Sequence, residues 1–362
     1  MKRVVLLYGG RSSEHEISCL SARSVLEVVD RDRYEVVTVG ITRDGRWTLT
    51  DGVIEPEAGE ELPHVSDEGP TVAVVGSRRG PQLVQLDDAG DATGDGVACA
   101  ARVIGAVDVA FPLLHGPWGE DGTVQGLLAT VGLPFVGADV TASSIGVDKA
   151  AMKASFGAKG LPQLNYRALH RARWDREPDD VTRELELALE LPWFVKPARQ
   201  GSSIGISKVS HPDALAEAMD AAYRHDQVAV VEQGVEGGRE LEVGVIGDAE
   251  LEVTAPGEIV PSHEFYDFEA KYLAASELLI PADVTDAVAA RIDDLARRAY
   301  RAIGCRGLAR VDFFALPDGE VVVNEINTIP GFTPASMFPR LWAAEGLDYR
   351  ALVDRLLADA RV

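Results

Sequence analysis

The sequence predicts a mixed fold, in which an open α/β domain at the N-terminus is followed by two domains of the α+β type. A chain of 362 residues is longer than one hydrophobic core usually supports, so two or three domains are expected. Strand-like and helix-like segments alternate over residues 1–148, which is typical of α/β domains. Two apolar runs near the C-terminus, joined by a turn sequence, predict an antiparallel hairpin. The predicted domains are 1–148, 149–238 and 239–362.

The N-terminal domain contains apolar runs of strand length that alternate with stretches of helical periodicity. Residues 51–100 interrupt this pattern, since they are rich in Gly and Asp and weakly periodic. We interpret them as an insertion with short strands. The other predicted elements are, in order, a strand that ends at Gly9 and Gly10, a helix through Val28, strands at 36–41 and 107–113, and a helix from Thr123.

The second domain is expected to open with a helix at 148–159, because Asp148 can accept hydrogen bonds from the first helical turn. A strand at 193–196 leads into a Gly- and Ser-rich loop at 198–205. The remaining predicted elements are an amphipathic helix at 211–225 and a strand at 228–232.

The third domain is expected to contain a helix and a hairpin. The helix at 285–303 has apolar residues three and four positions apart, which form one stripe. The hairpin turn is Leu316-Pro317-Asp318-Gly319, where Pro fixes φ and Gly can take a left-handed conformation.

Polar side chains interrupt both hairpin strands. Residues two apart on a strand share a face, so Arg310 and Asp312 point the same way from the first strand. Glu325 and Asn327 do so from the second. If the two faces coincide, two carboxylates, an amide oxygen and a guanidinium meet inside an apolar sheet, and hard oxygen ligands of this kind suit Mg²⁺. The alternative is a surface hairpin with a solvated polar face, but the apolar neighbours favour burial.

Composition excludes several classes of protein. The hydrophobic content of 46% and charged content of 26% are ordinary for a soluble globular chain. Apolar runs stay well short of a membrane span, and Met1-Lys2-Arg3 leads directly into a predicted strand at Val4, so neither a span nor a signal peptide is expected. A formal charge of −23 argues against nucleic acid as a partner, and a nucleotide site would have to concentrate its own positive charge. Three widely spaced cysteines fit a reduced cytoplasm.

Several segments resemble the motifs of one enzyme family. They are GGRSSEHEIS from Gly9, HGPWGEDG from His115, RQGSSIG from Arg199, FYDFEAKY from Phe265, the two hairpin strands, and TIPGFTPASM from Thr328. Together they extend over nearly the whole chain, which resembles the D-alanine–D-alanine ligases of the ATP-grasp superfamily. The resemblance implies a three-domain ATP-grasp fold with the α/β domain first. It also implies ATP and two Mg²⁺ ions, with Mn²⁺ as a substitute.

The reaction that this resemblance implies joins two D-alanine molecules into D-alanyl-D-alanine, while ATP becomes ADP and phosphate. The first D-alanine carboxylate would attack the γ-phosphate to give an acyl phosphate, and the second D-alanine amine would then displace phosphate. The product serves peptidoglycan precursor synthesis, and so cell wall biogenesis and cell shape. We expect a cytoplasmic homodimer that acts on small molecules, with neither a nucleic-acid nor a membrane partner.

The resemblance assigns substrate contacts in several segments. Glu14 is expected beside the ammonium group of the first D-alanine, with His115 facing the substrate. Ser336 would bind the carboxylate of the second D-alanine. Arg310 and the Gly331 N–H would form the oxyanion site.

Nucleotide contacts are assigned in the same way. Lys149 and Lys196 match the lysines that hold the α- and β-phosphates. The loop that contains Ser203 would fold over the triphosphate, and the Walker pattern of P-loop proteins does not occur. The further assignments are Glu232 to the adenine amino group, Glu240 to the ribose and Lys271 to the γ-phosphate.

The last assignments concern a lid and the metal ions. Tyr272 on a mobile loop would link to Ser202 and Glu14 and lock the closed state. From the sequence alone, that segment could equally be a surface loop packed over aromatic side chains. The residues that would hold the two Mg²⁺ ions are Asp312, Glu325 and Asn327.

Two other functions are compatible with the same fold. One is a D-alanine–D-lactate ligase, which forms an ester, or another carboxylate–amine ligase. The other is a nucleotide-binding regulator that has lost its chemistry. A regulator would not need both acidic metal ligands, so the intact set argues against it: Arg310, Asp312, Glu325 and Asn327.

Overall fold

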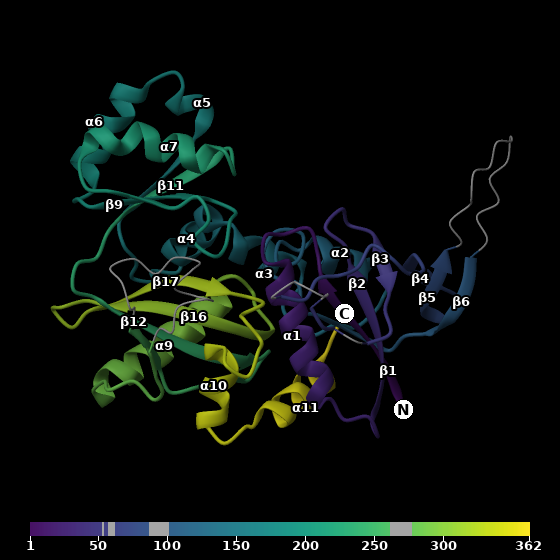
Figure 1. The fold of residues 1–362 in the computed structure, drawn as a ribbon. Helices are drawn as coiled ribbons and strands as arrows, with labels where there is room; N and C mark the ends of the chain where they lie inside the picture. Colours follow the sequence, from purple (N-terminus) through teal and green to yellow (C-terminus); the bar gives the residue numbers. More distant parts are fainter. Residues whose placement is uncertain (53, 57–61, 87–100, 261–276) are drawn as a thin grey trace, which may run out of the picture. The chain divides into compact units, whose positions relative to one another are not determined.

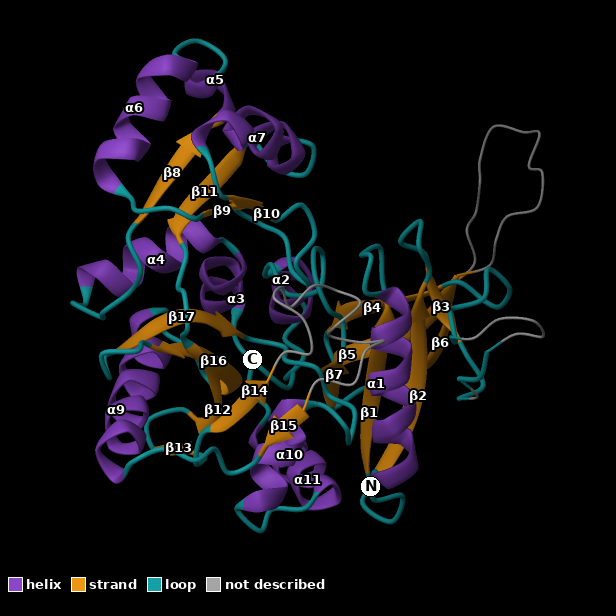
Figure 2. Cartoon of the chain, turned by 60° about the vertical axis from the view of Figure 1, so that its left-hand side comes forward, coloured by secondary structure: helices purple, strands orange, loops and turns teal. Residues whose placement is uncertain are grey.

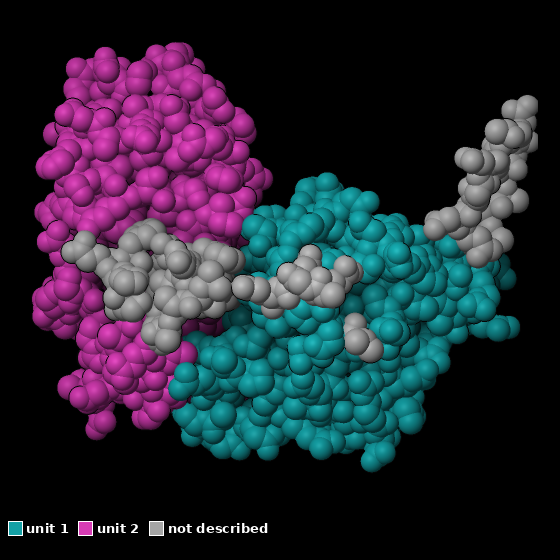
Figure 3. Space-filling view, viewed as in Figure 1, with its two compact units in different colours: residues 1–140, 306–308, 329–362 teal, residues 141–305, 309–328 magenta. Residues whose placement is uncertain are grey.

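The structure, a computed structural model, describes residues 1–52, 54–56, 62–86, 101–260 and 277–362. It contains two compact units, which Figure 3 shows in different colours. Unit 1 comprises residues 1–140, 306–308 and 329–362, and unit 2 comprises residues 141–305 and 309–328. The C-terminal segment therefore packs with the N-terminal part of the chain. The three predicted domain boundaries remain predictions.

Unit 1 is built on a sheet in the order β3-β2-β1-β7, in which β2, β1 and β7 are parallel. Residues Val4 to Leu7 on the central strand are almost completely buried, as in strands covered on both faces. Because the parallel strands end at the same edge, the loops after β1 and β7 lie at one edge of the sheet. The elements are β1 (Lys2–Gly9), α1 (His15–Val28), β2 (Tyr34–Ile41), β3 (Trp47–Leu49) and β7 (Val109–Pro112).

A second, antiparallel sheet of unit 1 has the order β4-β5-β6, so the predicted insertion does contain short strands. The C-terminal segment brings aromatic rings to the first sheet: Phe332 contacts Phe111 with ring centroids 5.6 Å apart. The elements are β4 (Val72–Ser77), β5 (Gly80–Leu86), β6 (Ala101–Ala106), α2 (Thr123–Thr130), α10 (Met337–Ala344) and α11 (Tyr349–Asp359).

The first sheet of unit 2 has the order β10-β9-β11-β8 and is antiparallel. Helices α5, α6 and α7 cover one side of it, and α4 lies on the other side (Figures 1 and 2). Leu185, Trp193 and Met219 belong to the core beneath the three covering helices. The elements are α4 (Lys149–Ala158), β8 (Tyr166–His170), α5 (Arg171–Trp174), α6 (Pro178–Ala188), β9 (Trp193–Pro197), β10 (Ser207–Val209), η1 (Pro212–Ala214), α7 (Leu215–Tyr223) and β11 (Val228–Gln233).

The second sheet of unit 2 has the order β15-β14-β12-β16-β17, with β13 beside β12. Helix α9 contacts β12 and β17, and buries Ile292, Leu295 and Ala299. Helix α3 (Val140–Val147) precedes α4 at the start of this unit. The other elements are β12 (Arg239–Gly247), β13 (Leu251–Val253), β14 (Gly257–Val260), β15 (Glu277–Leu279), α9 (Asp286–Ala302), β16 (Gly307–Ala315) and β17 (Val321–Asn327).

Local sequence signals agree with most of these elements. Asp148 caps α4 and Thr285 caps α9, and Gly319 has a left-handed φ of 89° in the hairpin turn. The helix predicted at 211–225 is shorter than expected: a 3₁₀ turn precedes α7. Pro212, whose ring fixes φ and removes the N–H donor, lies at the start of that turn.

Within the described residues, no helix is long and apolar enough to span a bilayer. Cys19 and Cys305 are buried free thiols, and Cys99 lies outside the described residues.

Candidate active site

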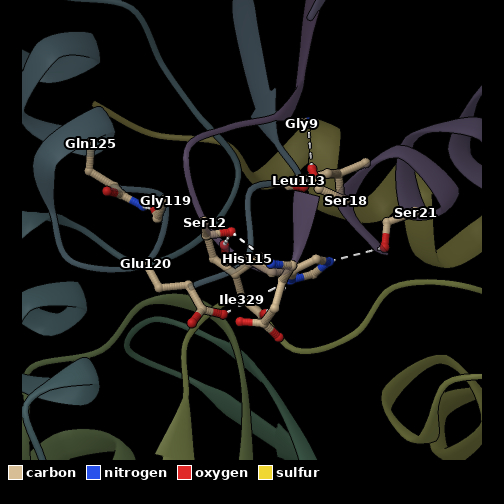
Figure 4. A network of polar contacts seen from close by, with 11 residues as sticks. Gly9, Ser12, Ser18, Ser21, Leu113, His115, Gly119, Glu120, Gln125 and Ile329 are labelled. Atoms are coloured by element: carbon tan, nitrogen blue, oxygen red, sulfur yellow. Dashed lines mark hydrogen bonds and ion pairs between the residues drawn. The ribbon is translucent and has the colours of Figure 1, made fainter. Parts of the chain in front are cut away.

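The predicted substrate residues of unit 1 lie where β1 and β7 end. Ser18 on α1 joins these two strand ends, because its hydroxyl accepts the Gly9 N–H at 2.7 Å and donates to the Leu113 carbonyl (Figure 4). Gly9 has a φ of 84°, and a Cβ at this position would lie 2.5 Å from the Ile41 carbonyl oxygen. A residue larger than glycine would therefore disturb the turn that leads to Glu14.

Glu14 lies against the loop that follows β7. The Ser12 hydroxyl donates to the His115 carbonyl at 2.6 Å and accepts the Glu14 N–H at 3.2 Å. A Cβ on Gly116 would approach Glu14 Oε2 to 2.8 Å, so the loop passes directly beside the carboxylate. Glu14 is also the N-cap residue of α1, where the helix dipole favours a negative charge. The structure thus brings Glu14 and His115 together, while their roles toward D-alanine remain predictions.

His115 is held by hydrogen bonds at both ring nitrogens. Nδ1 lies 3.1 Å from the Ile329 carbonyl, and Nε2 lies 3.0 Å from the Ser21 hydroxyl (Figure 4). A neutral imidazole satisfies both partners by donating from Nδ1 and accepting at Nε2. Burial lowers the pKa of His115, and the Glu14 carboxylate and the Ile329 carbonyl offset this only in part. The ring is therefore neutral, and it ties α1 to the C-terminal segment of unit 1.

A glutamine that the sequence analysis did not single out supports the same loop. Gln125 on α2 is almost fully buried, and its Nε2 donates to the Gly119 carbonyl at 2.8 Å. Asp121 accepts the N–H groups of Trp118 and Thr123, each at 2.9 Å. The loop that begins at His115 is consequently held by a hydrogen bond from α2 and by hydrogen bonds to its own Asp121. A polar residue within the apolar pattern of α2 was the signal that could have identified Gln125.

The predicted site for the second substrate is compact. Ser336 accepts the Thr333 N–H at 3.2 Å, and its hydroxyl lies 2.9 Å from that of Thr333. A Cβ on Gly331 would lie 3.1 Å from Ser336 Oγ. Gly331 and Ser336 are therefore neighbours, as two contacts of one small ligand would have to be. The Ile329 contact with His115 fixes the start of this segment.

In unit 2, the start of α4 presents the first predicted phosphate ligand. Asp148 accepts the N–H groups of Ala150 and Ala151 at 3.0 Å, which confirms the predicted cap. Lys149 Nζ donates to the Gln200 carbonyl at 2.7 Å. Its ammonium group therefore lies at the Gly- and Ser-rich loop.

Lys196 and Glu232 form a buried ion pair, with Lys196 Nζ 2.6 Å from Glu232 Oε2. Lys153 from α4 contacts the other oxygen, Oε1. Burial alone would raise the pKa of Glu232, but the two ammonium groups outweigh it and lower this pKa to about 2. Burial lowers the pKa of Lys196, yet Glu232 and then Glu325 and Glu240 outweigh it and raise this pKa.

Lys153 is a second residue that the sequence analysis missed. It follows Lys149 by four positions and so shares a face of α4, which was the available signal. Its importance depends on Glu232, which is 79 residues away in the sequence.

The predicted phosphate loop has an unusual backbone. Ser202 and Ser203 have φ values of 49° and 59°, which non-glycine residues rarely adopt. Such strain is typical of functional loops, and consecutive turns of this kind can point N–H groups at an anion. Arg199 anchors the start of the loop through a bidentate pair with Asp226, at 2.8 and 2.7 Å.

The hairpin places its polar residues together, as the sequence predicts. Arg310 is paired with Asn327 across the strands, and Asp312 with Glu325. Arg310 donates to both oxygens of Asp312 at 2.7 Å, and Asn327 Nδ2 donates to Asp312 Oδ2 at 3.0 Å. Asp312 is buried, which excludes the alternative of a solvated hairpin face at this end.

Glu242 on β12 is a third functional candidate that the sequence analysis missed. Its Oε2 lies 2.9 Å from Arg310 Nε, and both side chains are largely buried. Burial lowers the pKa of Arg310, but Asp312 and Glu242 outweigh it and raise this pKa further above its usual range. Glu242 follows Glu240 by two positions, so the alternation of β12 could have identified it.

Two predicted contacts lie outside the described residues, namely Lys271 and Tyr272. Among the residues that are described, no cluster of three or more His, Cys, Asp and Glu side chains is arranged to hold a metal ion. The predicted ligand set is of another kind, with two carboxylates and one amide.

Sequence profiles of one family match both parts of the chain. The profile of the D-Ala D-Ala ligase N-terminus matches residues 3–138, and that of the C-terminus matches residues 155–358. The chain belongs to the D-alanine–D-alanine ligase family. It is an enzyme of the ligase class, and its mixed α/β and α+β fold is the ATP-grasp fold of that family.

Relatives of this ligase family align over almost the full chain. A D-alanine–D-alanine ligase of Mycobacterium sp. (strain KMS) is 50% identical, over 99% of this chain and 96% of the relative. The D-alanine–D-alanine ligase of Pseudarthrobacter chlorophenolicus is 45% identical, over 98% of this chain and 93% of the relative.

Solved ligase structures agree. The VanG D-Ala:D-Ser ligase of Enterococcus faecalis has a TM-score of 0.81 at 32% identity and covers 99% of this chain and 98% of its own. The D-alanine–D-alanine ligase of Coxiella burnetii has a TM-score of 0.80 at 30% identity, and the match covers 99% of this chain and 93% of the Coxiella chain.

Proposed function

We propose that this ligase joins two D-alanine molecules into D-alanyl-D-alanine and converts ATP to ADP and phosphate. Membership of the family supports the reaction, and one feature of unit 2 supports its site. Burial lowers the pKa of Lys196 and of Arg310, and their nearest carboxylates raise it. Glu325 also raises the pKa of both groups, by a smaller effect. A predicted metal ligand, a predicted phosphate ligand and a predicted oxyanion ligand therefore lie within electrostatic range of one another.

The donor set of the hairpin fits magnesium. Asp312 and Glu325 are adjacent carboxylates, Asn327 offers an amide oxygen, and hard oxygen donors are what Mg²⁺ prefers. These three residues would hold two Mg²⁺ ions, or Mn²⁺ in their place. The ions would neutralise charge on the β- and γ-phosphates.

The protein's own cations would hold the nucleotide. Lys149 and Lys196 would contact the α- and β-phosphates, and Lys271 the γ-phosphate. Ser203 lies in a loop whose backbone N–H groups can approach phosphate oxygens and whose closure would exclude water. Glu232 would face the adenine amino group, and Glu240 the ribose.

The chemistry requires activation, because a carboxylate has no adequate leaving group. The first D-alanine carboxylate oxygen attacks the γ-phosphorus, ADP leaves, and an acyl phosphate forms. The neutral amine of the second D-alanine attacks the acyl carbon, and phosphate leaves with the bridging oxygen. Arg310 and the Gly331 N–H would stabilise the oxyanion of this step, and one such donor contributes about 3 kcal/mol.

Glu14 and His115 would orient the first D-alanine, and Ser336 would hold the carboxylate of the second. The Glu14 carboxylate suits an ammonium group, and neutral His115 is fixed beside it. Tyr272 and Ser202 would close the site over both substrates. None of these steps requires a covalent bond to the protein.

The product would serve peptidoglycan precursor synthesis, cell wall biogenesis and cell shape. We place the reaction in the cytoplasm, where ATP is available and the buried thiols Cys19 and Cys305 stay reduced. We also propose assembly as a homodimer, which light scattering of the purified protein would test. A mass equal to one chain of 38.8 kDa would contradict it.

Phosphate release with ATP and Mg²⁺, measured with and without D-alanine, tests the function. We expect release that depends on D-alanine and equals the D-alanyl-D-alanine formed. Release independent of D-alanine, or no release, would contradict the proposal. D-lactate offered beside D-alanine would distinguish ester from amide synthesis.

A further inference from the structure

Glu232 holds two lysines, one on each carboxylate oxygen. Lys153 contacts Oε1 and Lys196 lies 2.6 Å from Oε2. The side chains of Lys153 and Glu232 are each 2% exposed, whereas that of Lys196 is 15% exposed. Lys153 is thus the inner cation of this cluster, and Lys196 is the one closer to solvent.

The position of Lys153 is fixed by its helix and its surroundings. Its Nζ lies 5.5 Å from the centroid of the Tyr166 ring, a favourable place for a cation. Tyr166 is paired with Glu232 across β8 and β11, so ring and carboxylate hold the same ammonium group. The Lys153 carbonyl accepts a hydrogen bond from Gln163 Nε2 at 2.8 Å.

The charges of the cluster suggest what the second lysine does. A buried carboxylate with a single lysine would form a neutral pair, and that pair would hold its ammonium group tightly. With two lysines the cluster carries one excess positive charge. The Lys196 ammonium group can then interact with a phosphate, while the negative charge of Glu232 is still neutralised by Lys153.

We propose that Lys153 is a positioning residue for nucleotide binding, which shares Glu232 and so leaves Lys196 available to phosphate. Lys153 acts through Glu232 and does not itself contact the nucleotide. This inference rests on the proposed function, since it assumes that Lys196 binds a phosphate of the nucleotide.

Substitution of Lys153 tests the inference. In Lys153→Met, Glu232 pairs with Lys196 alone, so Lys196 is less available to phosphate. The dissociation constant for ADP should therefore rise about tenfold or more, as measured by calorimetry with Mg²⁺. Adenosine has no phosphate, and its dissociation constant should change less than about twofold. Lys159→Met, at the exposed end of α4, is the matched control and should leave both constants unchanged.

A second background separates this role from a structural one. In Glu232→Gln there is no carboxylate to share, so adding Lys153→Met should change ADP binding by less than about threefold. Equal losses in both backgrounds, or weaker binding of adenosine together with ADP, would show a packing role and overturn the inference. ADP binding by Lys153→Met within twofold of the wild type would overturn it as well.

The controls also distinguish this inference from the proposed function. Failure of the wild type to bind ADP would refute nucleotide binding itself. If Lys153→Met does not fold, as judged by thermal melting, Lys153→Gln makes the same comparison with the same expected outcomes.

Discussion

Asp312 on β16 and Glu325 on β17 are directly paired across the hairpin, although one extra residue, Asn324, precedes Glu325 in its strand. The extra residue makes a β-bulge, which bends a strand and changes the direction of its side chains. Beyond the bulge, Phe313 is paired with Val323 and both are buried. The hairpin thus combines a purely apolar end with an end that gathers two carboxylates.

Substitution of Glu325 tests the metal assignment. Glu325→Gln keeps the side-chain volume but removes a negative charge that would hold Mg²⁺, so turnover should fall by about a hundredfold or more. Steady-state phosphate release measures this. Glu320→Gln, at the exposed turn of the same hairpin, should retain full activity. A Glu325→Gln enzyme with more than about a tenth of wild-type activity would refute the assignment.

Arg310 tests the oxyanion assignment. Arg310→Lys keeps the charge but loses the planar fork that now spans both oxygens of Asp312. We expect kcat to fall about a hundredfold while the KM for ATP changes little. Arg291→Lys on the exposed face of α9 controls for the substitution type. A change confined to the KM for ATP would make Arg310 a nucleotide ligand instead.

His115 should make stability depend on pH. Burial lowers its pKa below the usual value of 6.5, so below that pH the unfolded chain binds a proton that the folded protein does not. The contribution of neutral His115 to the free energy of unfolding is complete above pH 6.5. It is lost as the pH falls toward the pKa of the folded state, by about 1.4 kcal/mol per pH unit for one proton.

Urea unfolding from pH 5 to 7.5 measures this slope. In His115→Asn the slope should be smaller, with a remainder from His15, whose pKa burial also lowers. The exposed His211→Gln is the control. Equal slopes in His115→Asn and the wild type would show that His115 does not titrate on unfolding.

The sequence predicts the hairpin well because its signals are local. Alternation within each strand places Arg310 on one face with Asp312 and Glu325 on one face with Asn327, and the Pro-Asp-Gly turn fixes where the chain reverses. The caps of α4 and α9 are equally local. These features agree with the structure because each depends on residues within a few positions.

Residues whose role depends on distant partners could not be predicted in this way. Lys153 and Glu242 are ordinary polar residues until the fold brings Glu232 and Arg310 to them. A lysine within a helix is usually exposed, and the Glu232 carboxylate on β11 together with the Tyr166 ring on β8 explains why Lys153 is buried. The extra residue in β17 also escapes an analysis of alternation, since a bulge shifts the pattern by one.

Tyr272 is predicted to favour amide over ester synthesis. Tyr272→Phe keeps the ring but removes the hydroxyl that would link to Ser202 and Glu14, so packing should survive while the polar network is lost. With D-alanine and D-lactate in competition, the variant should form more ester, most clearly at low pH, where the amine stays protonated. Mass spectrometry of the products from pH 6 to 9 measures the ratio. A ratio equal to that of the wild type at every pH would refute the role.

Transfer of ¹⁸O tests the central claim most directly, because it follows the carboxylate oxygen that must attack ATP. The enzyme is given ATP, Mg²⁺ and D-alanine labelled in its carboxylate with ¹⁸O, and the phosphate and dipeptide are analysed by mass spectrometry. We predict D-alanyl-D-alanine and one ¹⁸O atom in each phosphate released, as an acyl phosphate intermediate requires. Dipeptide formed with unlabelled phosphate, or labelled D-alanine recovered unreacted while ATP is hydrolysed, would contradict the account.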